Sequence, residues 1–113
     1  MSEHCLFCRI IKREIAAEIV AESESCLAFR DANPEAPLHV LVVPKKHVSS
    51  LNDVTDVECM GALATMAAQV AREAGVADSG YRTVINTNGN GGQSVFHLHL
   101  HVLGGRKLAW PPG

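Results

Sequence analysis

The chain has 113 residues, of which 47% are hydrophobic, and its formal net charge is −2 at pH 7. This length suits one domain with a sizeable apolar core and leaves no room for two. The near-zero charge argues against bulk electrostatic binding to nucleic acid or to an anionic membrane. Neither a secretory leader nor a run of about 20 apolar residues is present. We therefore expect a single domain over residues 1–113 in a cytoplasmic protein.

The N-terminal segment carries a Cys-x-x-Cys motif, formed by Cys5 and Cys8. Four cysteines in a chain without an export signal are more typical of thiols or metal ligands than of disulfides. Phe7, Ile10 and Ile11 would share one side of a short helix that follows from the motif. The motif supplies half of the ligands that a structural zinc ion needs. The alternatives are two reduced thiols or, less favoured without a surrounding βαβ pattern, a redox pair.

Three strands are predicted in the first half of the chain. The apolar segments at residues 19–23 and 26–30 indicate a hairpin with a short turn between them. Residues 31–37 follow as a loop, because two prolines exclude a regular element there. The β-branched run at residues 38–43 is typical of a central strand, and Pro44 ends it.

One long helix is predicted after this strand. It begins at a capping box, in which Thr55 and Glu58 would satisfy each other's free backbone N–H groups. Gly75 supplies the C-terminal stop. A further strand is predicted over residues 81–86. The helix would pack on the sheet through residues that recur at steps of three and four, namely Val57, Met60, Ala64, Ala67, Ala71 and Ala74.

A glycine-rich loop at residues 87–93 leads into a strand predicted over residues 94–103, where His97, His99 and His101 alternate with apolar residues. Alternation places the three imidazoles on one face, with neighbours about 7 Å apart and the outer pair about 13 Å apart. One small metal ion cannot bind all three, which disfavours a histidine-rich metal hydrolase. Such a cluster of titratable groups indicates a functional site. About five strands and two unequal helices without βαβ alternation predict an antiparallel α+β domain.

Four stretches together resemble the histidine-triad (HIT) family of nucleotide hydrolases and transferases: residues 5–8, 38–47, 97–103 and 104–113. The last of these, with the Gly-Gly-Gln-Ser sequence at residues 91–94, resembles the Hint branch of nucleoside phosphoramidate hydrolases. The resemblance implies the HIT fold, an antiparallel sheet of about five strands with one long and one short helix. It also implies a homodimer.

The resemblance assigns catalytic roles around the central histidine. His99 would attack the α-phosphorus and form a nucleotidyl-histidine that water later hydrolyses. Imidazole can do this when an acceptor holds its other nitrogen. His101 would donate to a phosphate oxygen, and Ser94 would help to protonate the departing amine. His39, which by itself reads as a satisfied core histidine, would orient the triad through a hydrogen bond.

The resemblance also implies a nucleotide-binding set. Asp31 would accept the ribose hydroxyls beside Ala32, where the family often has a larger aliphatic residue. From the residues alone, Asp31 and Asn86 could equally be turn formers. A glycine-rich loop can be a plain connector, but directly before the histidines it indicates backbone N–H groups that cradle an anion. The set comprises Asp31, Ala32, Asn86, Gly92, Gln93, Ser94, His99 and His101, with Phe7, Ile10, Phe29 and Leu41 as candidate walls for the base.

Some branches of the family carry a zinc ion held by two cysteines and two histidines, whereas many Hint-branch members lack the cysteines. The resemblance therefore implies structural Zn²⁺ on Cys5, Cys8, His47 and His97, with His4 as a less favoured ligand. Such an ion would pin the N-terminal segment to the chain that carries the nucleophile. No organic cofactor is expected.

The activity expected from this resemblance is hydrolysis of purine nucleoside 5′-phosphoramidates, of the adenosine 5′-monophosphoramidase type. One alternative is hydrolysis of dinucleoside polyphosphates or adenylyl conjugates, and the tail with Trp110 favours the first activity over it. Another alternative is a nucleotide-binding interaction module with incidental catalysis. The expected partners are a purine nucleotide and a second copy of the chain, with neither nucleic acid nor membrane.

Overall fold

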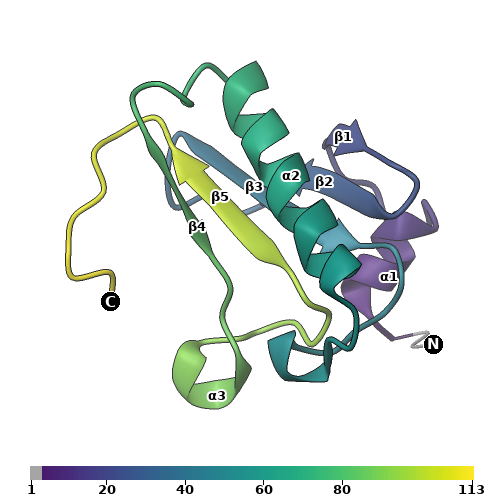
Figure 1. Cartoon of the computed structure of the whole chain (residues 1–113). Helices are drawn as coiled ribbons and strands as arrows, with labels where there is room; N and C mark the ends of the chain where they lie inside the picture. The colour runs from purple at the N-terminus through teal and green to yellow at the C-terminus, as the bar shows by residue number, and fades with distance from the viewer. Residues whose placement is uncertain (1–3) are drawn as a thin grey trace.

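The computed structural model describes residues 4–113, and its central element is a five-stranded sheet in which every neighbouring pair is antiparallel (Figure 1). The strand order is β1-β2-β3-β5-β4, so the last strand in sequence lies between β3 and β4. The α+β antiparallel architecture predicted from the sequence is confirmed. The strands are β1 Ile19–Glu22, β2 Cys26–Arg30, β3 Leu38–Pro44, β4 Tyr81–Val84 and β5 Leu100–Gly104.

The helices number one more than predicted among the described residues. They are α1 Leu6–Ile11, α2 Val57–Glu73 and α3 Asn88–Gly91, and a 3₁₀ turn covers Leu51–Asp53. The expected long helix is α2 and the expected short helix is α1, and α3 is an additional turn of helix inside the glycine-rich segment. Glycine and asparagine are weak helix formers, but the Gln93 side chain accepts a hydrogen bond from the Asn88 amide at 2.9 Å and so closes this turn.

The sheet is covered on both faces, which explains why β3 reads as an unbroken apolar run. The helix α2 lies across one face (Figure 1), and α1 packs on the other. The α2 layer includes Ala28, Val40, Val42, Leu63, Leu98, Leu100 and Val102. The α1 layer includes Phe7, Ile10, Leu27, Phe29, Leu41 and Val43. Because side chains alternate along a strand, the burial of Leu100 and Val102 under α2 directs His101 to the α1 side.

The start and the buried face of α2 differ from the prediction. Asp56, not Thr55, caps the helix, and its carboxylate accepts from the Cys59 amide at 2.6 Å. Val57 is 87% exposed, since it sits in the first turn beyond the edge of the sheet. Gly75 follows the helix with φ +77°, as expected for a C-terminal stop. The buried face consists of Leu63, Met66, Ala67, Val70 and Ala71, so Ala64 and Ala74 are exposed as well.

The predicted strand at residues 94–103 is regular only from Leu100 onward, and residues 94–99 are irregular. The backbone N–H of Leu98 donates to the Val48 carbonyl at 2.7 Å, outside the sheet ladder, which explains the late start of β5. On the neighbouring strand, β4 ends at Val84, so Asn86 lies in the connection to α3. Within residues 4–113, no helix is both long and apolar enough to cross a membrane.

Candidate active site and metal site

A cleft of about 500 Å³ opens on the α1 side of the sheet. Its apolar wall contains all four residues suggested as walls for a base, Phe7, Ile10, Phe29 and Leu41. Its polar end contains five residues of the predicted nucleotide-binding set, Asp31, Ala32, Ser94, His99 and His101. The cleft therefore joins a flat apolar slot to a group of hydrogen-bonding side chains, which is the usual composition of a small-molecule site.

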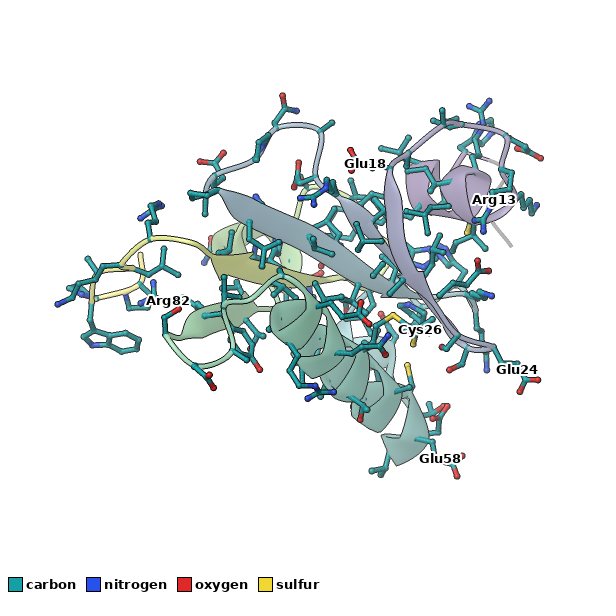
Figure 2. The ribbon with its side chains drawn as sticks, turned by 90° about the horizontal axis from the view of Figure 1, so that it is seen from above. Arg13, Glu18, Glu24, Cys26, Glu58 and Arg82 are labelled. Atoms are coloured by element: carbon teal, nitrogen blue, oxygen red, sulfur yellow. The ribbon has the colours of Figure 1, made fainter. Side chains whose placement is uncertain are left out.

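A second cavity, of about 660 Å³, is larger but lies elsewhere. Cys26 of β2 and Glu58 of α2, both labelled in Figure 2, border it near the N-terminal end of α2. Neither His99 nor His101 lines this cavity. Volume alone does not mark a reactive centre, so the smaller cleft, with its convergent imidazoles, is the candidate active site.

The backbone selects one tautomer of the His99 ring, which lines the cleft. Its Nδ1 lies 2.7 Å from the backbone carbonyl oxygen of His97. A carbonyl only accepts, so Nδ1 carries the proton and Nε2 of the neutral ring has a lone pair. The ring of Phe7 meets the His99 ring edge-on at 5.1 Å, and His99 is buried. The backbone and α1 thus fix both the tautomer and the orientation of this imidazole.

His39 and His101 form a hydrogen-bonded pair that we call the histidine relay. The backbone N–H of Glu35 donates to His39 Nδ1 at 2.9 Å, so the neutral His39 ring carries its proton on Nε2. That nitrogen lies 2.8 Å from His101 Nδ1, which must accept. His101 therefore carries its proton on Nε2. A single backbone amide sets the tautomer of both rings.

The outer nitrogen of the relay is buried, and His101 Nε2 has no hydrogen-bond partner among residues 4–113. Burial, reinforced by His99 and His39, lowers the pKa of His101 to about 4 against an opposing effect of Asp31. The ring is therefore neutral at pH 7. A buried N–H group without a partner is rare, and here it belongs to a ring that lines the cleft.

Asp31 lies beside the relay at the mouth of the cleft. Its Oδ1 accepts from the Asn33 amide at 2.8 Å, and its Oδ2 lies 3.4 Å from His39 Nε2. The carboxylate is only partly buried and lines the cleft together with Ala32. The turn that was an alternative explanation for this aspartate is present, and the same carboxylate also faces the site.

Most of the residues predicted to bind nucleotide in and around the glycine-rich segment do not line the cleft. The Gln93 side-chain amide donates to the carbonyl oxygens of Ser49 at 2.8 Å and Val95 at 3.1 Å, so it ties the segment to the chain around these two residues. Gly92, at φ +86°, ends α3 in the left-handed conformation that favours glycine. Of the predicted residues in this region only Ser94 lines the cleft, whereas Asn86, Gly92 and Gln93 do not.

Four side chains converge next to the active site, and we call Cys5, Cys8, His47 and His97 the cysteine–histidine cluster. His97 Nδ1 lies 3.3 Å from Cys5 Sγ, 3.5 Å from Cys8 Sγ and 3.2 Å from His47 Nδ1. Cys8 Sγ lies 3.3 Å from His47 Nδ1. Burial lowers the pKa of His97 to about 4, so its ring is neutral, as a metal ligand must be.

These distances suit a tetrahedral ion. Ligand bonds of about 2.3 Å to sulfur and 2.0–2.1 Å to nitrogen put tetrahedral ligand atoms about 3.3–3.8 Å apart. His97 Nε2 donates to the Pro44 carbonyl at 2.8 Å, which leaves Nδ1 with the lone pair that a metal needs. His4 is exposed and outside the cluster. The four residues therefore fit one Zn²⁺ in a closed, structural site.

Sequence reasoning missed the backbone groups that set the tautomers of His97, His99 and His39, namely the carbonyls of Pro44 and His97 and the amide of Glu35. Every residue carries a carbonyl and every residue except proline carries an N–H group, so no residue type could have indicated them. It also missed apolar cleft residues whose types are ordinary core types, namely Leu6, Ile15, Ala16, Ala17 and Val95.

The family model for the HIT domain matches residues 12–108. The purine nucleoside phosphoramidase of Escherichia coli is 44% identical over 96% of this chain and 92% of its own. A HIT family hydrolase from Legionella pneumophila superposes with a TM-score of 0.95 at 48% identity, covering 97% of this chain and all of the other. A zinc-bound histidine-triad protein from Mycobacterium smegmatis gives 0.82 at 35% identity, covering 95% and 81%. With its sequence, fold and histidine arrangement in agreement, this chain belongs to the HIT family.

Proposed function

We propose that this protein hydrolyses purine nucleoside 5′-phosphoramidates to a nucleoside monophosphate and an amine. One observation carries the proposal: in one cleft, His99 offers an unprotonated Nε2 beside a ring, His101, whose Nε2–H has no partner among the described residues. A nucleophile beside a hydrogen-bond donor is what displacement at a phosphoryl centre requires. The named activity of the Escherichia coli relative supports the choice of substrate.

In the first step, His99 Nε2 attacks the α-phosphorus and the phosphorus–nitrogen bond breaks. The amine leaves with a proton from the Ser94 hydroxyl, which is exposed at the rim of the cleft. In the second step, water attacks the nucleotidyl-histidine, its proton restores the serine, and the nucleoside monophosphate is released. The hydrogen bond from His99 Nδ1 to the His97 carbonyl stabilises the positive charge that the ring acquires.

His101 stabilises the phosphate during both steps. Its Nε2–H is oriented by the relay before substrate arrives, so little reorganisation is needed when charge builds up on a phosphate oxygen. The backbone N–H group of Ser94, which lines the cleft, adds a further donor. The base occupies the slot between Phe7 and Leu41, and Asp31 accepts from the ribose hydroxyls.

A zinc ion held by the cysteine–histidine cluster would have a structural role. Four protein ligands leave no open position for a substrate. Cys5 and Cys8 belong to α1 and its N-cap, and His97 precedes the nucleophile by two residues. The ion would therefore tie the helix that supplies Phe7 to the chain segment that supplies His99.

A homodimer forms part of the proposal. The strand β4 is an edge of the sheet, and Tyr81 on it is 37% exposed. An open edge strand presents unpaired backbone groups to a second chain. Sedimentation or light scattering of the purified protein measures the state, and a monomer at micromolar concentration contradicts this part alone.

The test of the activity is a substrate panel with the wild type and His99→Ala. We expect an adenosine 5′-phosphoramidate to be cleaved and His99→Ala to lose at least about 10⁴-fold in kcat while it retains the fold and binds the nucleotide. Mass spectrometry of quenched wild-type reactions should find a nucleotide on His99. His4→Ala, outside both clusters, is the control.

Other outcomes separate the alternatives. Preferred cleavage of dinucleoside polyphosphates or adenylyl conjugates would replace the proposed substrate class. Nucleotide binding without turnover or a covalent intermediate would favour a binding module. Retained turnover in His99→Ala would refute the mechanism itself.

A further inference from the structure

The donor that fixes the histidine relay comes from a loop without regular structure. Residues 31–37 form neither helix nor strand, and Pro34 and Pro37 have no backbone N–H. The amide of Glu35 nevertheless donates to His39 Nδ1 at 2.9 Å. A loop of this kind needs an anchor if one of its few amides is to hold a fixed direction.

The anchor is an arginine from the C-terminal tail. Arg106 Nη2 donates to the Glu35 carbonyl at 2.9 Å. The carbonyl and the N–H of Glu35 flank the same Cα, so the bonds to Arg106 and His39 together restrict both backbone dihedrals of this residue. Arg106 also donates to the Lys107 carbonyl at 3.2 Å, which holds its own guanidinium in place.

The turn at the end of β5 brings Arg106 to this position. Gly105 adopts φ +89°, and a Cβ atom there would lie 2.8 Å from Pro37 Cβ. The tail therefore turns directly against the loop, as closely as a residue without a side chain allows. Arg106 is the next residue, so its guanidinium lies within hydrogen-bond distance of the Glu35 carbonyl.

We infer that Arg106 is a positioning residue for the histidine relay. It holds Glu35 so that the amide keeps His39 in the Nε2–H tautomer and His101 as an Nε2–H donor. The inference rests on the proposed function, because His101 matters there as a phosphate donor. Arg106 itself touches neither His39 nor His101 through any hydrogen bond of the structure.

Loss of this anchor has a definite chemical consequence. If the Glu35 amide leaves His39 Nδ1, the proton of His39 can move to Nδ1. His39 Nε2 then accepts from His101 Nδ1, and His101 Nε2 becomes a lone pair. A lone pair repels a phosphate oxygen where an N–H group would bind it, so the relay in that state opposes the transition state.

A second arginine provides a matched control. Arg82 Nη2 donates to the Ala109 carbonyl at 2.8 Å, and its guanidinium lies 5.9 Å from the centre of the Trp110 ring. It therefore clamps the same tail through the same chemistry. Figure 2 shows Arg82 beside the tail, far from Arg13 at the α1 end of the molecule. Arg82 has no hydrogen bond to the loop at residues 31–37.

The experiment compares Arg106→Met, Arg106→Lys and Arg82→Met in the full chain. Nitrogen-15 spectra of labelled histidine report which ring nitrogens of His39 and His101 carry protons. Steady-state kinetics on a nucleoside phosphoramidate report kcat and KM. We expect Arg106→Met to reduce the Nε2–H signal of His39 and to lower kcat about tenfold with little change in KM. Arg106→Lys, which restores a donor, should recover most of both, and Arg82→Met should change neither.

Unchanged ring-nitrogen signals in Arg106→Met overturn the inference, and so do shifted signals with an unchanged kcat. Thermal unfolding of each variant identifies a general loss of structure, which would lower the signals of all histidines together. If the wild type cleaves no phosphoramidate, the proposed function fails. The nitrogen signals still decide whether Arg106 sets the tautomers, so the two failures are distinguishable.

Discussion

The spacing of potential ligand atoms is similar in the cysteine–histidine cluster and in the group formed by Asp31 and the histidine relay. Each brings at least three potential ligand atoms within 4.8 Å of one another. The two groups differ in the hydrogen-bond partner of the histidine ring nitrogen that points away from the group. His97 donates from Nε2 to the Pro44 carbonyl and so turns a lone pair toward its cluster. His39 accepts the Glu35 amide on Nδ1 and so turns a proton toward His101.

This contrast shows that ligand spacing alone does not define a metal site. A histidine that binds a metal usually donates its other N–H to a carbonyl or carboxylate. His97 has such a partner, and His39 has the opposite one. In the cysteine–histidine cluster the backbone partner selects the His97 tautomer that can bind a cation. In the relay it selects the tautomers of His39 and His101 that place a proton on His101 Nε2. Two neighbouring sites with similar side chains are therefore suited to different chemistry.

The largest effect is expected from removing a cysteine ligand. Cys5→Ser keeps the cap of α1, since serine accepts the Cys8 amide as the cysteine now does, but it loses the soft ligand. We expect the wild type to bind one Zn²⁺ per chain and Cys5→Ser to bind none. The unfolding free energy should fall by about 4 kcal/mol when free zinc is a thousand times its dissociation constant. Elemental analysis and thermal unfolding measure the two quantities.

Cys59→Ser is the control, because Cys59 is only partly buried and lies outside both groups. It should retain one zinc per chain. Two zinc ions in the wild type would contradict the comparison directly, since the second ion would have to be held by Asp31 and the relay.

The next effect comes from deleting the Glu35 amide. Glu35→Pro removes the N–H that occupies His39 Nδ1, whereas Glu35→Ala keeps it. We expect Glu35→Pro to lower kcat about 10- to 100-fold, the range typical of a lost outer-shell partner. Freed of the amide, His39 can carry its proton on Nδ1, so this variant should also gain a weak second site for Co²⁺.

Cobalt absorption distinguishes the two sites, because only the cysteine–histidine cluster gives sulfur-to-cobalt charge transfer. Glu35→Ala should bind one Co²⁺ and retain its turnover. If Glu35→Pro and Glu35→Ala give the same turnover and the same cobalt binding, the hydrogen bond from the Glu35 amide to His39 Nδ1 does not determine what the relay binds.

The third effect concerns the pH dependence of the free energy of unfolding. The pKa of His101 falls from 6.5 to about 4 on folding, chiefly through burial. Between these values the unfolded chain binds more protons than the folded one, so stability rises with pH. The contribution of His101 is complete above pH 6.5 and is lost as the pH falls toward 4. We expect this loss to be about 3 kcal/mol, measured by denaturant unfolding at several pH values.

His101→Asn removes the titrating group, so its stability should depend less steeply on pH over the same range. An equal slope in the two proteins would show that the ring is not held neutral in the fold. Glu22, whose pKa is lowered mainly by Lys45, titrates in both proteins and cancels in the comparison.

The fold was largely predictable because periodicity records which faces are buried. The run at residues 38–43 indicates a strand covered on both sides, and β3 is such a strand. The phase of α2 and the helix α3 were not predictable. Alanine fits both a buried and an exposed helical position, and α3 depends on the Gln93 side chain, which closes it from a distance in sequence.

The sequence also supplied the side chains of the site but not their protonation. His39 and His101 could be named, yet the tautomer of each depends on a backbone group that any residue could supply. The same limit applies to Arg106. It belongs to the tail that resembles the Hint branch, but its contact with the Glu35 carbonyl depends on a turn whose direction is a tertiary property.

The smallest effect tests that turn. Gly75 and Gly105 both adopt a left-handed φ, but a Cβ at Gly75 meets open space, whereas one at Gly105 lies 2.8 Å from Pro37 Cβ. Gly75→Ala should therefore cost only the backbone strain, about 1 kcal/mol. Gly105→Ala should cost somewhat more and displace the loop from Arg106, so kcat should fall while zinc content stays the same. Thermal unfolding, kinetics and elemental analysis of Gly75→Ala and Gly105→Ala test whether the C-terminal tail supports the histidine relay without affecting the zinc site. Equal kcat values in the two variants would show that the turn at Gly105 does not position the histidine relay. A loss of zinc in Gly105→Ala would mean that the cysteine–histidine cluster and the relay are not independent.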